Sequence, residues 1–117
     1  MSAPRLLIVD DEERLLDLLR RYMERRGFEV ETCASAEAAW DLFSQDPQRF
    51  SLVITDLTLP GMSGADLIER MRGRNKTLPA LITSGYPYEP VLKGVDFLQK
   101  PFLPSMLLAK VRALLDA

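Results

Sequence analysis

Carboxylates, one hydroxyl and one lysine stand at the ends of short strand-like runs in this sequence. These residues are Asp10 and Asp11, Asp56, Ser84 and Lys100. The chain contains no histidine, so it lacks the commonest general base and the commonest transition-metal ligand. Any chemistry must therefore use carboxylates, hydroxyls, the lysine and hard cations that prefer oxygen ligands.

Three carboxylates brought together repel one another unless cations neutralise them. One divalent cation and the ammonium of Lys100 bring the charge of such a group to zero. Clustered carboxylates suit Mg²⁺, which takes about six oxygen ligands. The same cation, with an ammonium and a hydroxyl, can bind the oxygens of a phosphoryl group, whose transfer depends mainly on positioning and electrostatic stabilisation. A carboxylate is an adequate nucleophile toward phosphorus and gives an aspartyl phosphate.

Strand-like and helix-like patterns alternate along the chain, which is typical of a parallel sheet with helices on both faces. Continuous apolar runs at 6–9, 52–55 and 80–83 indicate central strands buried on both sides. The half-polar run 28–32 indicates an edge strand, and 97–99 the last strand. We therefore expect an α/β fold, a (βα)₅ doubly wound, five-stranded parallel sheet in the flavodoxin-like order 2-1-3-4-5.

Helices are expected at 12–26, after a cap at Ser35, at about 64–72 and from Pro104. In the first of these, apolar residues at positions 15, 16, 18, 19, 22 and 23 form one stripe at a period of roughly 3.6 residues. Gly27 then ends that helix.

The crossover between Ser84 and Phe97 differs from the others. Its 12 residues are about the minimum for a connection between parallel strands. Pro87 and Pro90 lie within it and disfavour a continuous helix. We predict that the fourth helix is a single turn or absent.

In an open parallel sheet, ligands bind at the carboxyl ends of the strands, beside the point where the strand order reverses. Asp10 and Asp11 end strand 1 and Asp56 ends strand 3, on either side of that point. Ser84 and Lys100 end strands 4 and 5. Asp56 is the carboxylate best placed to act as the nucleophile.

The sequence resembles the bacterial response-regulator receiver domain (CheY-like) over essentially its whole length, and we expect residues 1–117 to form a single such domain. The motifs that carry the resemblance are LLIVDDE at 6–12, ITDLTLPGMSG at 54–64, TSG at 83–85 and KPF at 100–102. The TSGYP sequence at 83–87 and the short crossover resemble those of receivers attached to hybrid sensor histidine kinases.

The resemblance implies a metal site and a phosphoacceptor. It makes Asp56 the phosphoacceptor and Mg²⁺ the cofactor. Asp11 and Asp56 would coordinate Mg²⁺ directly, Asp10 mainly through a water, and the backbone carbonyl of Thr58 would be a further ligand.

The resemblance also assigns the remaining strand-end residues. Ser84 and Lys100 would bind the phosphoryl oxygens, and Ser84 and Phe97 would act as the conformational switch. The Lys100–Pro101 bond is expected to be cis. Many family members use their fourth helix, with strand 5 and the last helix, to dimerise or signal, and the short crossover weakens that expectation here.

The function implied is phosphorelay signal transduction, in which a phosphohistidine on a histidine kinase or histidine phosphotransfer domain donates the phosphoryl group. Such a domain is regulatory and catalyses only its own phosphorylation and dephosphorylation. Two alternatives stay open, a docking module without phosphorylation and a metal-dependent phosphohydrolase with an aspartate nucleophile. The phosphohydrolase usually needs a second acid two residues after the nucleophile, where this chain has Thr58.

Composition limits the partners and the compartment. The net charge of −2 gives no reason to expect nucleic-acid binding. No apolar run approaches the roughly 20 residues of a membrane span. One cysteine, Cys33, cannot form an intrachain disulfide and indicates a reducing, cytoplasmic location. No feature of the sequence determines an oligomeric state.

Overall fold

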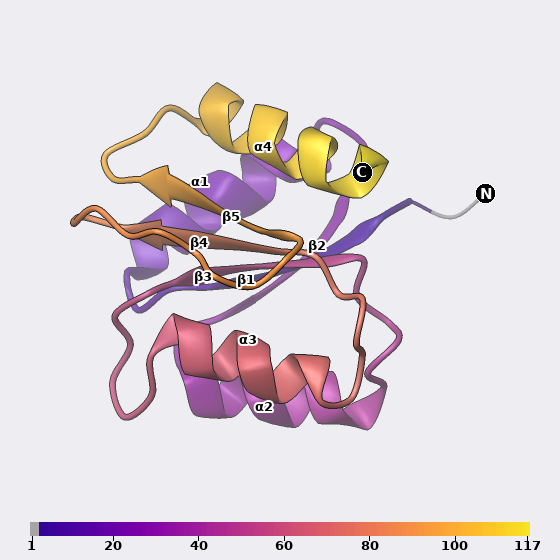
Figure 1. The fold of residues 1–117 in the computed structure, drawn as a ribbon. Coiled ribbons are helices and arrows are strands. Elements are labelled where there is room, and N and C mark those ends of the chain that lie inside the picture. Colours follow the sequence, from indigo (N-terminus) through magenta and orange to yellow (C-terminus); the bar gives the residue numbers. More distant parts are fainter. Residues whose placement is uncertain (1–2) are drawn as a thin grey trace.

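The computed structural model describes residues 3–117 and contains a five-stranded parallel sheet in the order β2-β1-β3-β4-β5. The strands are β1 (Arg5–Val9), β2 (Glu29–Cys33), β3 (Leu52–Asp56), β4 (Ala80–Ser84) and β5 (Val95–Gln99). The helices are α1 (Glu13–Glu24), α2 (Ala36–Gln45), α3 (Gly64–Arg72) and α4 (Pro104–Asp116). Helices α1 and α4 lie on one side of the sheet and α2 and α3 on the other (Figure 1). The predicted fold and strand order are confirmed.

The two sides of the sheet carry two separate apolar layers. Successive side chains of a strand point to opposite faces, so Leu7 and Val9 pack toward α2 and α3, while Leu6 and Ile8 pack toward α1 and α4. All four side chains are at most 1% exposed. This burial on both faces explains why the central strands are continuous apolar runs.

The helix ends follow local chemistry. The hydroxyl of Ser35 accepts a hydrogen bond from the Ala38 N–H at 3.1 Å and caps α2, as predicted. Gly27 follows α1 with φ +91°, a left-handed conformation that favours glycine. Within the apolar stripe of α1, Leu18 is 52% exposed. Leu18 lies at the edge of the stripe, toward the side of the helix that faces solvent.

Residues 85–94, all within the described chain, contain no helix and connect β4 to β5 as an irregular strap (Figure 1). We call them the β4–β5 segment. Arg72, at the end of α3, donates a hydrogen bond to the carbonyl of Lys93, at the far end of this segment, at 2.5 Å. It also donates to the carbonyl of Leu78, which precedes β4, at 2.9 Å. The prediction that the helix between the fourth and fifth strands is short or absent is confirmed. Within residues 3–117, no helix has the length and hydropathy needed to cross a membrane.

Candidate functional site

The three strand-end carboxylates lie together in the structure. Asp10 and Asp11 follow β1 and Asp56 ends β3, and the parallel pairing of Val9 with Thr55 brings these strand ends to the same edge of the sheet. One carboxylate oxygen from each aspartate lies within 4.8 Å of the other two. Oxygen donors at this spacing can share one hard cation.

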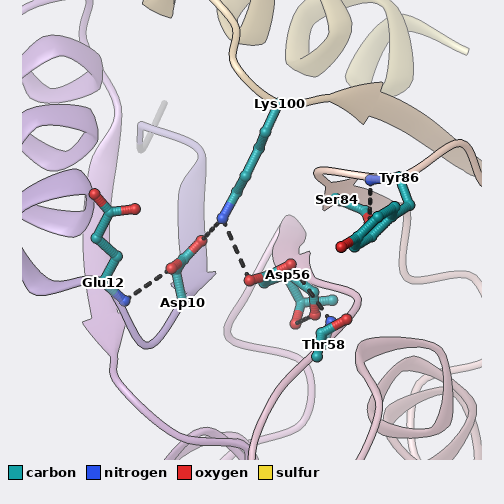
Figure 2. Close-up of polar contacts among 8 residues, drawn as sticks. Asp10, Glu12, Asp56, Thr58, Ser84, Tyr86 and Lys100 are labelled. Carbon is teal, nitrogen blue, oxygen red and sulfur yellow. Dashed lines mark hydrogen bonds and ion pairs between the residues drawn. The ribbon is translucent and has the colours of Figure 1, made fainter.

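Lys100 lies between two of these acids (Figure 2). Its Nζ is 2.7 Å from Asp10 Oδ2 and 3.3 Å from Asp56 Oδ2. Burial by itself lowers the pKa of Lys100, but the hydrogen bonds that Lys100 donates to Asp10 and Asp56 and the negative charges of these two carboxylates outweigh it, so that the pKa is raised. The side chain therefore carries a positive charge at neutral pH.

Asp10 is held by contacts on both of its carboxylate oxygens. Oδ1 accepts a hydrogen bond from the Glu12 N–H at 2.8 Å, and Oδ2 accepts from Lys100 (Figure 2). The residue is only 3% exposed, whereas Asp11 is exposed. The two neighbouring acids thus differ, because one is fixed within the protein and the other faces solvent.

Asp56 is positioned by the turn that leads into α3. Its Oδ1 lies 3.4 Å from the Thr58 N–H, and its side chain is 12% exposed. The Gly64 N–H donates to the Leu57 carbonyl at 2.8 Å, which brings the start of α3 against the end of β3. A β-carbon on Gly64 would lie 2.2 Å from the Asp56 carbonyl oxygen. Only glycine permits this approach, a role that the sequence analysis missed because a glycine after a serine cap indicates only a helix start.

Ser84 and Phe97 lie on the neighbouring strands. Ser84 is 2% exposed, and its hydroxyl oxygen accepts a hydrogen bond from the Tyr86 N–H at 3.1 Å (Figure 2). Its carbonyl accepts from the Lys100 N–H at 2.7 Å, which ties the ends of β4 and β5 together. Phe97 is half-buried and contacts Tyr88, with 6.2 Å between the ring centroids. Tyr88 was missed by the sequence analysis, because a lone tyrosine beside prolines gives no pattern.

The Lys100–Pro101 peptide bond is cis, as the sequence resemblance implied.

A family model described as the response regulator receiver domain matches residues 6–112. The chain belongs to this receiver family. Among curated proteins, it is 35% identical to Protein PetR of Rhodobacter capsulatus, over 97% of this chain and 49% of that protein. It is 30% identical to the transcriptional regulatory protein SrrA of Staphylococcus aureus, over 94% of this chain and 47% of that protein. The receiver chain thus spans about half the length of the curated relatives it matches.

Solved receiver structures agree in fold. The receiver domain from the hybrid histidine kinase CckA is 32% identical with a TM-score of 0.86, covering 95% of this chain and 98% of that chain. A putative response regulator from Chloroflexus aurantiacus is 31% identical with a TM-score of 0.85, covering 99% of this chain and 100% of that chain. The predicted resemblance to receivers, including one from a hybrid kinase, is confirmed.

Family membership confirms the predicted role in phosphorelay signal transduction and makes this a regulatory domain. At the edge of the sheet, Asp10, Asp11 and Asp56 form a group of three carboxylates.

Proposed function

We propose that Asp56 accepts a phosphoryl group from a phosphohistidine on a histidine kinase or histidine phosphotransfer domain, in a Mg²⁺-dependent reaction. The observation that carries the proposal is the group of three carboxylates within 4.8 Å of one another, with Lys100 bridging Asp10 and Asp56. The donor set is all oxygen and carries three negative charges, which suits Mg²⁺ over a softer metal. Asp10, Asp11, Asp56 and the Thr58 carbonyl would hold it.

The reaction requires little beyond positioning and charge neutralisation. An oxygen of Asp56 attacks phosphorus, the bond from phosphorus to the donor's imidazole nitrogen breaks, and the electron pair stays on that nitrogen. Lys100 and the Ser84 hydroxyl receive oxygens of the transferred group. Mg²⁺, when bound, offsets the negative charge that gathers on those oxygens. Lys100 is already within reach, since its Nζ contacts Asp56 at 3.3 Å.

The same contacts support a switch. Ser84 Oγ accepts from the Tyr86 N–H at 3.1 Å in this structure. Turning the Ser84 hydroxyl toward a phosphoryl oxygen changes that contact and hence the start of the β4–β5 segment. Phe97, whose ring contacts Tyr88 of the same segment, is the second proposed switch residue.

The proposal covers residues 1–117 as one receiver domain in the cytoplasm that catalyses only its own phosphorylation and dephosphorylation. Family membership and the single reduced cysteine, Cys33, support these statements.

Intact-mass measurement after incubation with acetyl phosphate tests the proposal. With Mg²⁺ the protein should gain one phosphoryl group that hydroxylamine removes, as expected of an acyl phosphate. Asp56→Asn should gain none, whereas the matched control Asp41→Asn, on the exposed side of α2, should label like the wild type. Labelling of Asp56→Asn at the wild-type level, or no labelling of wild-type protein that binds Mg²⁺, would overturn the proposal. Repeated turnover of a phosphate ester would instead indicate the phosphohydrolase.

A further inference from the structure

A pocket lies at the amino ends of β4 and β5, at the edge of the sheet opposite the three carboxylates, and the end of α4 borders it (Figure 1). Its volume is about 330 Å³, which is within the range of small-molecule sites. Since each strand is five residues long, roughly 15 Å of sheet separates it from the phosphoacceptor site. We call it the basic pocket, after its lining residues Arg72, Lys76, Thr77, Pro79, Lys93 and Leu114.

The basic pocket carries an excess of positive charge. Its lining includes three cations, Arg72, Lys76 and Lys93, and no aspartate or glutamate. None of the three forms an ion pair within the described residues. Arg74 and Asp116, exposed close to lining residues along the chain, contribute one charge of each sign. The terminal carboxylate of the chain also borders the pocket, so that three cations face one carboxylate and positive charge remains in excess.

The guanidinium of Arg72 is fixed in position but only partly used. Its Nε and Nη1 donate to the carbonyls of Leu78 and Lys93, which are neutral acceptors. Nη2 donates no hydrogen bond within residues 3–117, and it faces Gly94, where a β-carbon would lie 3.0 Å from it. Burial lowers the pKa of Arg72, and no carboxylate opposes this effect. The positive charge of Arg72 is therefore available to an anion that enters the pocket.

The charge and shape of the basic pocket suit a phosphate monoester better than a carboxylate. A phosphate monoester carries close to two negative charges at neutral pH and offers three acceptor oxygens, whereas a carboxylate carries one charge. Guanidinium and ammonium groups both bind phosphate oxygens, and the planar guanidinium can donate two parallel hydrogen bonds. Thr77 supplies a hydroxyl donor, and the partly buried side chains of Pro79 and Leu114 form an apolar wall for the organic part of such a ligand.

We propose that the basic pocket binds a small organic phosphate. The phosphoryl group contacts Arg72, Lys76 and Lys93, and the organic part lies against Pro79 and Leu114. Because Lys93 belongs to the far end of the β4–β5 segment, a bound phosphate also fixes that end of the segment. The proposal does not depend on phosphorylation of the chain.

The probe is phenyl phosphate, titrated against isotope-labelled protein at low salt without Mg²⁺, so that the result is independent of the phosphoacceptor proposal. Amide chemical-shift changes should gather at Arg72, Thr77 and Gly94. Phenol, which lacks the phosphoryl group, should bind roughly tenfold more weakly or not at all. Inorganic phosphate, which lacks the ring, should bind at the same residues severalfold more weakly. Raising the salt from about 0.01 M to about 0.15 M should also weaken binding severalfold, because it screens the cations.

Protein variants locate the binding. Lys76→Gln and Lys93→Gln each remove one exposed charge and should each weaken binding of phenyl phosphate by roughly three- to tenfold, with a larger loss in the combined variant. Arg14→Gln removes an exposed charge on α1 and should bind like the wild type. The proposal is overturned if phenyl phosphate does not bind, if the combined lysine variant binds it equally, or if the shift changes are confined to another face. A glutamate-rich peptide that binds at these residues in preference to phenyl phosphate would also overturn it, because the pocket would then belong to a surface for an acidic protein.

Discussion

Replacing Asp11 by asparagine should stabilise the metal-free protein while removing most of the stabilisation that Mg²⁺ provides. At 4.8 Å, two carboxylates repel by about 0.9 kcal/mol in a water-like dielectric and by about 3.5 kcal/mol at an effective dielectric constant of about 20. Asp11 is exposed, so the water-like value applies, and its two pairs, with Asp10 and Asp56, contribute about 2 kcal/mol. A negative charge near the start of α1 is favourable by about 0.3–1 kcal/mol. The ammonium of Lys100, which contacts both Asp10 and Asp56, offsets roughly one of the two repulsions, so the net gain is at most about 1 kcal/mol.

Urea unfolding with EDTA and with Mg²⁺ measures both effects. For the wild type, Mg²⁺ at about 100 times its dissociation constant should add about 2.7 kcal/mol to the free energy of unfolding. For Asp11→Asn this gain should be largely lost, because one oxygen donor and one negative charge are missing. Asp41→Asn, an exposed aspartate away from the site, should behave like the wild type. A metal-free Asp11→Asn protein that is less stable than the wild type, or one that Mg²⁺ stabilises equally, would refute the reasoning.

Three further measurements test other parts of the structure. Gly64→Ala should lower the free energy of unfolding by roughly 2–4 kcal/mol and slow phosphorylation, because a β-carbon meets a carbonyl oxygen at 2.2 Å. Gly85→Ala, with no atom within 4 Å, should change stability by less than about 1 kcal/mol. Cys33 should react slowly with a thiol reagent at neutral pH until urea unfolds the protein, since burial raises its pKa; rapid reaction of the folded protein would contradict this. Arg72→Gln should speed amide exchange across the β4–β5 segment with α1 unaffected, and unchanged exchange there would contradict the contacts described.

The strand ends could be predicted from sequence because the signals involved are local. A strand buried on both faces is a continuous apolar run, so the first polar residue after it marks the strand end. Parallel strands then bring such residues to one edge of the sheet. Asp10 and Asp56 follow this rule, whereas Lys100 comes after the half-buried strand β5. The structure brings all three into contact. The absence of a helix between β4 and β5 was predictable for the same reason, since Pro87 and Pro90 act on the backbone beside them.

Features that depend on long-range contacts could not be predicted in this way. Gly64 matters because α3 approaches the end of β3, and no local pattern reports that approach. Strand β5 begins at Val95, two residues before the predicted start, because pairing with β4 extends it through half-buried residues. The contact between the rings of Tyr88 and Phe97 and the hydrogen bond from Arg72 to the Lys93 carbonyl likewise join segments that are apart in sequence.

The group formed by Asp10, Asp11 and Asp56 is electrostatically unfavourable in the metal-free protein, and this cost indicates a function. Elsewhere the described chain has two apolar layers, and serine side chains cap α2 and α3. At the ends of β1 and β3, three carboxylates meet one ammonium, an arrangement that costs stability when no further cation is present. Proteins that break a local rule in this way tend to do so at functional sites. The repulsion that destabilises the metal-free protein is relieved when a cation binds, so the same free energy increases the affinity for that cation.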